Sequence, residues 1–95
     1  MNMNVQIKFK AFTNELIDYY QSAIGDDLSY MHETCEYDGY DDIYNAVLHG
    51  LANDNLPLPR KTWLQCKEFA AYDETGEEEQ LLYKIPILND IRLVA

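Results

Sequence analysis

The feature that most constrains the fold of this chain is a helical repeat of apolar residues near its N-terminus. Between residues 5 and 23, apolar side chains recur at spacings of 4, 3, 4, 3 and 4, which places them along one side of an α-helix. Asn2 or Asn4 is suited to cap the start of this helix, and Gly25 to end it in a left-handed turn. Because the repeat covers three heptads or fewer, we expect it to face an intramolecular core. Its members are Val5, Phe9, Phe12, Leu16, Tyr19 and Ala23.

Two further helices are predicted in the first half of the chain. Residues 26–36 form the second helix and residues 41–51 form the third. The glycine-containing segment 37–40 is predicted to be the turn between them. The side chains predicted to face inward are Leu28, Met31 and Cys35 in the second helix, and Ile43, Val47, Leu48 and Leu51 in the third.

The last third of the chain is predicted to be an antiparallel β-meander. Residues 53–60 form an extended connection, since the two prolines in this segment disfavour a helical conformation in the residue before each of them. Segments 63–72 and 80–88 flank a polar, glycine-containing stretch of the kind that joins antiparallel strands. A short final strand is predicted over residues 91–94.

The fold class that follows is α+β. Two or three N-terminal helices, over about residues 3–52, pack on a small antiparallel β part, residues 61–95. The alternative is an all-α fold, because Thr62 and Thr75 each begin the capping-box pattern that starts a helix. With 95 residues, 47% of them hydrophobic, the chain is expected to form a single acidic domain over residues 1–95.

The charge distribution constrains the partners of the protein. From residue 11 to residue 59 the chain has no Lys or Arg but ten carboxylates, and seven of these fall within residues 26–42. A formal net charge of −10 and a pI near 4.3 argue against direct binding of nucleic acid or anionic lipid. No apolar run approaches the eighteen or so residues that span a bilayer, so we expect a cytoplasmic protein without a membrane partner.

The side chains needed for catalysis or metal binding do not form recognisable motifs. His32 and Cys35 have a usable spacing for zinc, but His49 and Cys66 do not supply the second close pair that structural zinc sites use. The acids around Asp41 lack the spacing of a calcium-binding loop. The glutamates near Cys35 are expected to raise its pKa, which disfavours a nucleophilic thiolate. We therefore expect no enzymatic activity, no cofactor and no metal.

The acidic block is instead predicted to be a partner-binding surface. Carboxylates on successive turns of a helix lie about 5–6 Å apart, a scale comparable with the phosphate spacing along a nucleic-acid strand. Tyrosines within the block suit the desolvated anchors of an interface. Such a surface would occupy the Lys/Arg channel of a nucleic-acid-binding protein and inhibit it. The predicted residues are Asp26, Asp27, Tyr30, Glu33, Glu36, Tyr37, Asp38, Tyr40, Asp41 and Asp42.

In size, charge and tyrosine content, residues 11–59 resemble the small acidic anti-CRISPR and anti-restriction proteins with which phages and mobile elements mimic DNA. The resemblance is to a class, so it transfers no functional residues. It implies an inhibitor, a monomer or weak homodimer, whose partner is a basic nucleic-acid-binding protein of host defence. Two alternatives stay open. One is an immunity protein or antitoxin that caps a basic nuclease toxin, and the other is a structural or scaffold subunit with a merely solubilising surface.

Overall fold

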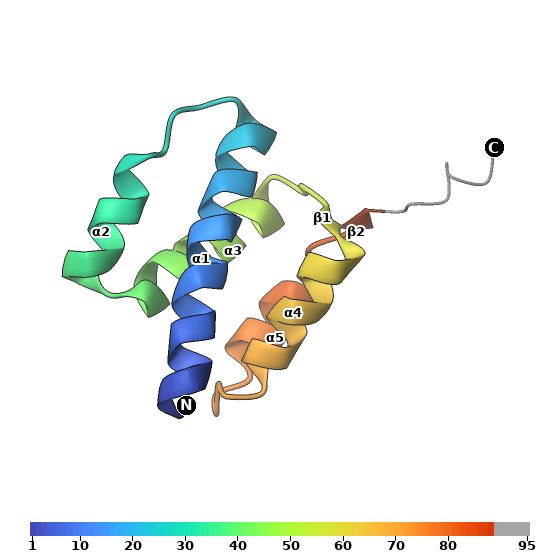
Figure 1. The fold of residues 1–95 in the computed structure, drawn as a ribbon. Helices are drawn as coiled ribbons and strands as arrows, with labels where there is room; N and C mark the ends of the chain where they lie inside the picture. The colour runs from blue at the N-terminus through green and yellow to red at the C-terminus, as the bar shows by residue number, and fades with distance from the viewer. Residues whose placement is uncertain (89–95) are drawn as a thin grey trace. The chain divides into compact units, whose positions relative to one another are not determined.

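A computed structural model describes residues 1–88, and the chain is mostly helical there (Figure 1). It divides into two compact units, unit 1 (Met1–His49) and unit 2 (Gly50–Ala95). The expectation of a single domain stays a prediction. In chain order the elements are α1 (Met3–Ile24), α2 (Tyr30–Asp38), α3 (Tyr40–Asn53), β1 (Leu58–Pro59), α4 (Arg60–Ala70), α5 (Glu77–Leu82) and β2 (Ile87–Leu88).

The first helix, α1, begins and ends where the sequence predicts. The Asn2 side chain accepts a hydrogen bond from the Val5 N–H at 2.9 Å, which satisfies one of the free N–H groups of the first turn. At the other end Gly25 adopts a left-handed backbone with φ 74°, and its N–H donates to the Gln21 carbonyl at 3.0 Å. Both predicted ends are confirmed. They could be predicted from the sequence because each depends on contacts within a few residues.

The buried apolar residues of unit 1 come from α1 and α3, together with Cys35 on α2. Phe9 is buried on α1, and its ring meets the buried ring of Tyr44 on α3 edge-on, with centroids 4.8 Å apart. Thr13 is also buried, and its hydroxyl donates to the Phe9 carbonyl at 2.9 Å. Tyr44 therefore belongs to the core, although it lies within the acidic stretch of residues 11–59. The other buried apolar residues of these two helices are Leu16, Ile17, Val47 and Leu48 in unit 1, and Leu51 in the part of α3 that belongs to unit 2.

The second helix, α2, begins four residues later than predicted. The Asp27 carboxylate accepts hydrogen bonds from the Ser29 N–H at 3.0 Å and from the Ser29 hydroxyl at 2.7 Å. Such local side-chain bonds compete with helix formation and favour a turn. The predicted start at residue 26 is therefore wrong, although Cys35 is buried as predicted.

The predicted turn over residues 37–40 is reduced to a single residue. α2 continues to Asp38 and α3 begins at Tyr40, with Gly39 between them. Gly39 has φ 99° and ψ 142°, a conformation that glycine adopts at little steric cost and other residues rarely adopt. The change of chain direction between α2 and α3 thus depends on the missing side chain of Gly39.

The antiparallel β-meander predicted for the last third is wrong. The segment 63–72 lies mainly in α4, and the segment 80–88 runs from α5 into β2. The buried residues of α4 recur every three to four positions, which is the period of a helix, whereas a half-buried strand would bury every second residue. The all-α alternative fits better. These buried residues are Trp63, Cys66, Phe69 and Ala70.

The start of α5 is organised by a polar turn. Asp73 accepts hydrogen bonds from the Glu78 N–H at 2.9 Å and from the Thr75 N–H at 3.1 Å. The Thr75 hydroxyl in turn accepts from the Glu77 N–H at 3.2 Å. A helix therefore begins just after Thr75, as the all-α alternative expected, but Gly76 is its N-cap and Asp73 binds the N–H groups that a capping box would satisfy.

A two-residue parallel pair joins the segment just before α4 to the end of the described part of unit 2. Leu58 pairs with Ile87, and Pro59 with Leu88. The extended conformation predicted before α4 is therefore found at residues 58–59, while α4 already begins at residue 60. The predicted final strand, residues 91–94, lies outside the described residues. Among the helices of residues 1–88, none has both the length and the apolar character needed to cross a bilayer.

Candidate partner-binding surface

The ten predicted partner-binding residues all lie in unit 1, along the turn before α2, on α2 and at the start of α3. Nine of them are exposed and Tyr40 is half-buried. In the part of the chain that the structure describes, none of their seven carboxylates forms a salt bridge with a Lys or Arg. Unit 1 contains nine carboxylates and two lysines, which gives a formal charge of −7, whereas unit 2 has eight carboxylates and five basic residues, which gives −3.

Three of the ten residues share one face of α2. At about 100° per residue, the side chains of Tyr30, Glu33 and Tyr37 lie within an arc of roughly 60°. Cys35, the buried residue of α2, lies on the opposite side of the helix. Tyr30 is 59% and Tyr37 is 85% exposed, so this arc faces solvent. We call Tyr30, Glu33 and Tyr37 the α2 outer face, and Asp38 falls outside it.

Tyr40 and Glu36 contact each other and do not both remain free for a partner. The Tyr40 hydroxyl donates to the Glu36 carboxylate at 2.8 Å, and this bond is the main reason why the pKa of Tyr40 is raised. The Lys10 ammonium lies 5.5 Å from the centroid of the Tyr40 ring, a distance at which a cation is attracted to an aromatic face. Lys10 therefore places one cation near the junction of α2 and α3.

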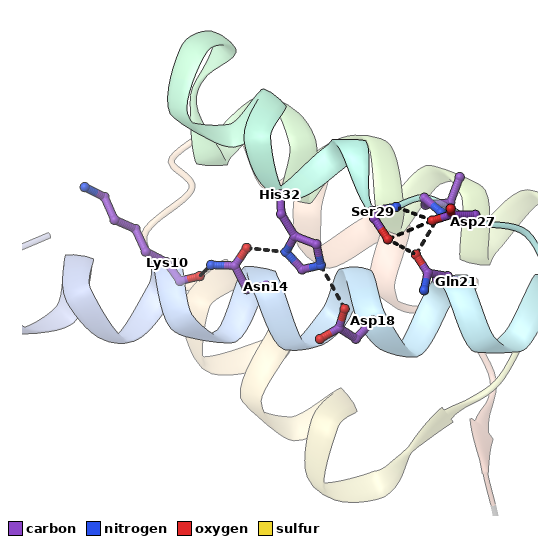
Figure 2. A network of polar contacts seen from close by, with 8 residues as sticks. Lys10, Asn14, Asp18, Gln21, Asp27, Ser29 and His32 are labelled. Atoms are coloured by element: carbon purple, nitrogen blue, oxygen red, sulfur yellow. Dashed lines mark hydrogen bonds and ion pairs between the residues drawn. The ribbon is translucent and has the colours of Figure 1, made fainter.

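A pair of polar contacts joins α2 to α1 (Figure 2). His32 Nδ1 lies 2.6 Å from Asn14 Oδ1, and His32 Nε2 lies 2.8 Å from Asp18 Oδ1. The Asn14 amide nitrogen donates to the Lys10 carbonyl at 3.2 Å, which orients the Asn14 oxygen toward His32. Both ring nitrogens thus face oxygen acceptors, and an imidazole ring donates to both of them only in its protonated form. We call His32, Asn14 and Asp18 the His32 clip.

A second set of polar contacts closes the turn before α2. The Gln21 side-chain oxygen accepts from the Leu28 N–H at 2.8 Å and lies 3.5 Å from the Ser29 hydroxyl (Figure 2). Hydrogen bonds from the side chain and then the backbone of Ser29 lower the pKa of Asp27. Asp27 therefore has a structural role besides its predicted place in the acidic surface.

The sequence pattern did not identify the residues that position α2. Asn14 and Asp18 are separated by one helical turn, on the polar side of α1, and this spacing is the signal that could have drawn attention to them. Their partner, His32, is 18 and 14 residues away along the chain. Such a contact is not visible until α2 is placed against α1.

The two cysteines are not part of a metal-binding cluster in the described residues. Cys35 and Cys66 are both buried free thiols. Burial, followed by the charge of Glu36, raises the pKa of the Cys35 thiol, in the direction expected from the sequence, and this disfavours the nucleophilic thiolate. Within residues 1–88 no group of three or more His, Cys, Asp or Glu side chains is arranged to hold a metal ion.

Comparisons with known proteins identify no relative. No protein-family model matches the chain, and neither the curated proteins nor the solved structures contain a match to it.

Proposed function

We propose that this protein is a small acidic inhibitor that binds a basic nucleic-acid-binding protein and occupies its DNA channel, in the manner of anti-CRISPR and anti-restriction DNA mimics. The observation that supports this most is the exposure of seven carboxylates within residues 26–42, none in a salt bridge with Lys or Arg in the described chain. Concentrated like charge destabilises the folded state by self-repulsion. A partner that supplies Lys and Arg side chains would relieve this repulsion on binding.

The local structure of unit 1 is suited to such a role. α2 carries three of the carboxylates, and the His32 clip and the Gln21 contacts hold α2 and its preceding turn against α1. A surface held in place before binding loses less conformational entropy when it meets a partner. The charge of unit 1 would also speed encounter with a cationic surface. In this proposal the protein acts by binding alone.

The proposal is tested by capture from a nuclease-treated bacterial lysate, with the wild-type protein as bait, followed by elution with duplex DNA. We expect the bait to retain basic nucleic-acid-binding proteins and DNA to elute them, because both compete for one channel. The matched bait carries Asp38→Lys, Asp41→Lys and Asp42→Lys and should lose these proteins. Retention of the same DNA-eluted proteins by both baits would contradict the proposal.

A second variant controls for total charge. Asp54, Glu74 and Glu77 are exposed carboxylates outside unit 1, and changing all three to Lys alters the net charge by the same amount. If binding depends on the acidic segment of unit 1, this variant should retain the DNA-eluted proteins. If both triple variants lose them equally, net charge alone explains the capture. Proteins retained by the wild type but not eluted by DNA would favour the alternative of an immunity protein that covers another part of a toxin.

A further inference from the structure

Two glutamate–tyrosine pairs, each with a spacing of four residues, have a lysine over the tyrosine ring. In unit 1, Tyr40 donates to Glu36 at 2.8 Å, and the Lys10 ammonium lies 5.5 Å from the ring centroid. In unit 2, Tyr83 donates to Glu79 at 3.2 Å. Each pair combines a carboxylate, which attracts a cation by charge, with an aromatic face, which attracts it through the ring quadrupole.

The unit 2 pair makes the closer set of contacts. The Lys67 ammonium lies 4.6 Å from the Tyr83 ring centroid, 3.5 Å from the Glu79 carboxylate, and within hydrogen-bonding distance of the Tyr83 hydroxyl. These contacts with Tyr83, followed by the charge of Glu79, raise the pKa of Lys67. A glutamate and a tyrosine one helical turn apart therefore form a local binding site for a cationic side chain.

A third pair with this spacing lies on the α2 outer face and holds no cation from unit 1. Glu33 and Tyr37 are one turn apart on α2, and both are exposed. Tyr30 extends the same face by a further turn, and within residues 1–88 neither Tyr30 nor Tyr37 has a cation over its ring. The nearest basic residues in the sequence are far from α2, since the chain has no Lys or Arg from residue 11 to residue 59.

We propose that the α2 outer face is a recognition site for arginine side chains of the partner, with Tyr30 and Tyr37 stacking on guanidinium groups and Glu33 binding them. This deepens the proposed function, on which it rests, by naming the groups that are bound. Arginine suits the site better than lysine, because a planar and weakly hydrated guanidinium stacks on an exposed ring while it also bonds a carboxylate through two N–H groups. The uncompensated charge around the face complements a partner of this kind.

The test uses the full-length protein and two labelled peptides, deca-arginine and deca-lysine, with binding followed by fluorescence anisotropy. The wild type should bind deca-arginine more tightly than deca-lysine. Tyr30→Ala with Tyr37→Ala should weaken deca-arginine binding about 5- to 30-fold, since one exposed cation–aromatic contact contributes about 2- to 5-fold. Alanine favours a helix, so circular dichroism should show α2 intact in this variant.

Two controls separate the rings from other effects. Tyr30→Phe with Tyr37→Phe keeps both aromatic faces and should keep most of the affinity. Tyr72→Ala removes another exposed tyrosine, 51% exposed, which follows Glu68 by four residues but lies beyond the end of α4 at Ala70. It should bind as the wild type does. If the Tyr30/Tyr37 alanine variant binds deca-arginine with wild-type affinity, the proposal is overturned. If the wild type binds both peptides equally and the alanine variant loses affinity for both to the same extent, the assignment to arginine is overturned.

Failure of this inference and failure of the proposed function give different results. If the Tyr30/Tyr37 alanine variant binds deca-arginine normally while DNA still elutes the captured proteins, the α2 assignment is wrong and DNA mimicry stands. If the variant loses deca-arginine but the captured proteins are not nucleic-acid-binding, the arginine site stands and DNA mimicry is wrong.

Discussion

Replacing His32 by alanine should release α2 from α1 without unfolding the rest of unit 1. The change removes the contacts to Asn14 at 2.6 Å and to Asp18 at 2.8 Å. Hydrogen bonds contribute about 0.5–1.5 kcal/mol each, and the Asp18 contact belongs at the low end because its carboxylate is 68% exposed. The expected loss is therefore about 1–2 kcal/mol.

The loss should be local because α2 has few other means of staying in place. α2 is nine residues long, which is too short for an isolated helix to be stable in water, and Cys35 is its one buried residue. Amide hydrogen exchange measured by NMR should therefore be about 5- to 30-fold faster across α2, which corresponds to 1–2 kcal/mol. The amides in the middle of α1 should keep their wild-type rates.

Two further variants make this experiment decisive. His49→Ala removes the other histidine, which is exposed on α3, and should leave α2 exchange unchanged. Asp18→Asn keeps an acceptor for His32 but removes the charge, so its effect should be smaller than that of His32→Ala. Wild-type exchange in α2 of the His32→Ala protein would refute the reasoning, as would an equal acceleration throughout unit 1.

Three other predictions concern stability. Trp63→Phe should lower the free energy of unfolding by about 1–3 kcal/mol in chemical denaturation followed by circular dichroism, because the buried indole N–H donates to the Leu82 and Ile85 carbonyls at 3.2 and 3.1 Å. The Ile85 carbonyl would lose this donor, whereas the Leu82 carbonyl keeps the Ile85 N–H at 2.9 Å. Gly39→Ala should cost about 1–3 kcal/mol in the same assay through backbone strain at φ 99°, since a Cβ would meet open space there; an unchanged midpoint would contradict this. The hydrogen bond from the Glu78 N–H is the first cause that lowers the pKa of Asp73. The stabilising effect of the ionised Asp73 is therefore complete above the ordinary aspartate pKa of about 4 and is lost as the pH falls through the lower pKa of the folded state. Asp73→Asn should flatten the dependence of stability on pH in this range, and an unaltered dependence would exclude this role of Asp73.

Two residues have contacts that the sequence pattern did not predict, one because its partners are distant in the chain and one because of a wrongly predicted turn. His32 was considered as a zinc ligand, but it contacts Asn14 and Asp18 on α1. Tyr40 was predicted to anchor a partner, but it is held by Glu36 across Gly39 and lies near Lys10. The turn predicted over residues 37–40 did not indicate that Glu36, near the end of α2, and Tyr40, at the start of α3, would meet across the single residue Gly39.

Local rules were enough to place α1 and to reveal the anionic character of residues 11–59. The ends of α1 depend on the caps at Asn2 and Gly25, which act within one turn, and net charge is a property of composition that folding does not alter. Whether the segment 63–72 is a strand or a helix depended on which side chains could be buried, and Trp63 makes its hydrogen bonds to residues 19 and 22 positions away. Contacts across such separations decide which conformation is stable. They cannot be predicted from a short stretch of sequence, because the groups involved meet only when the chain has folded.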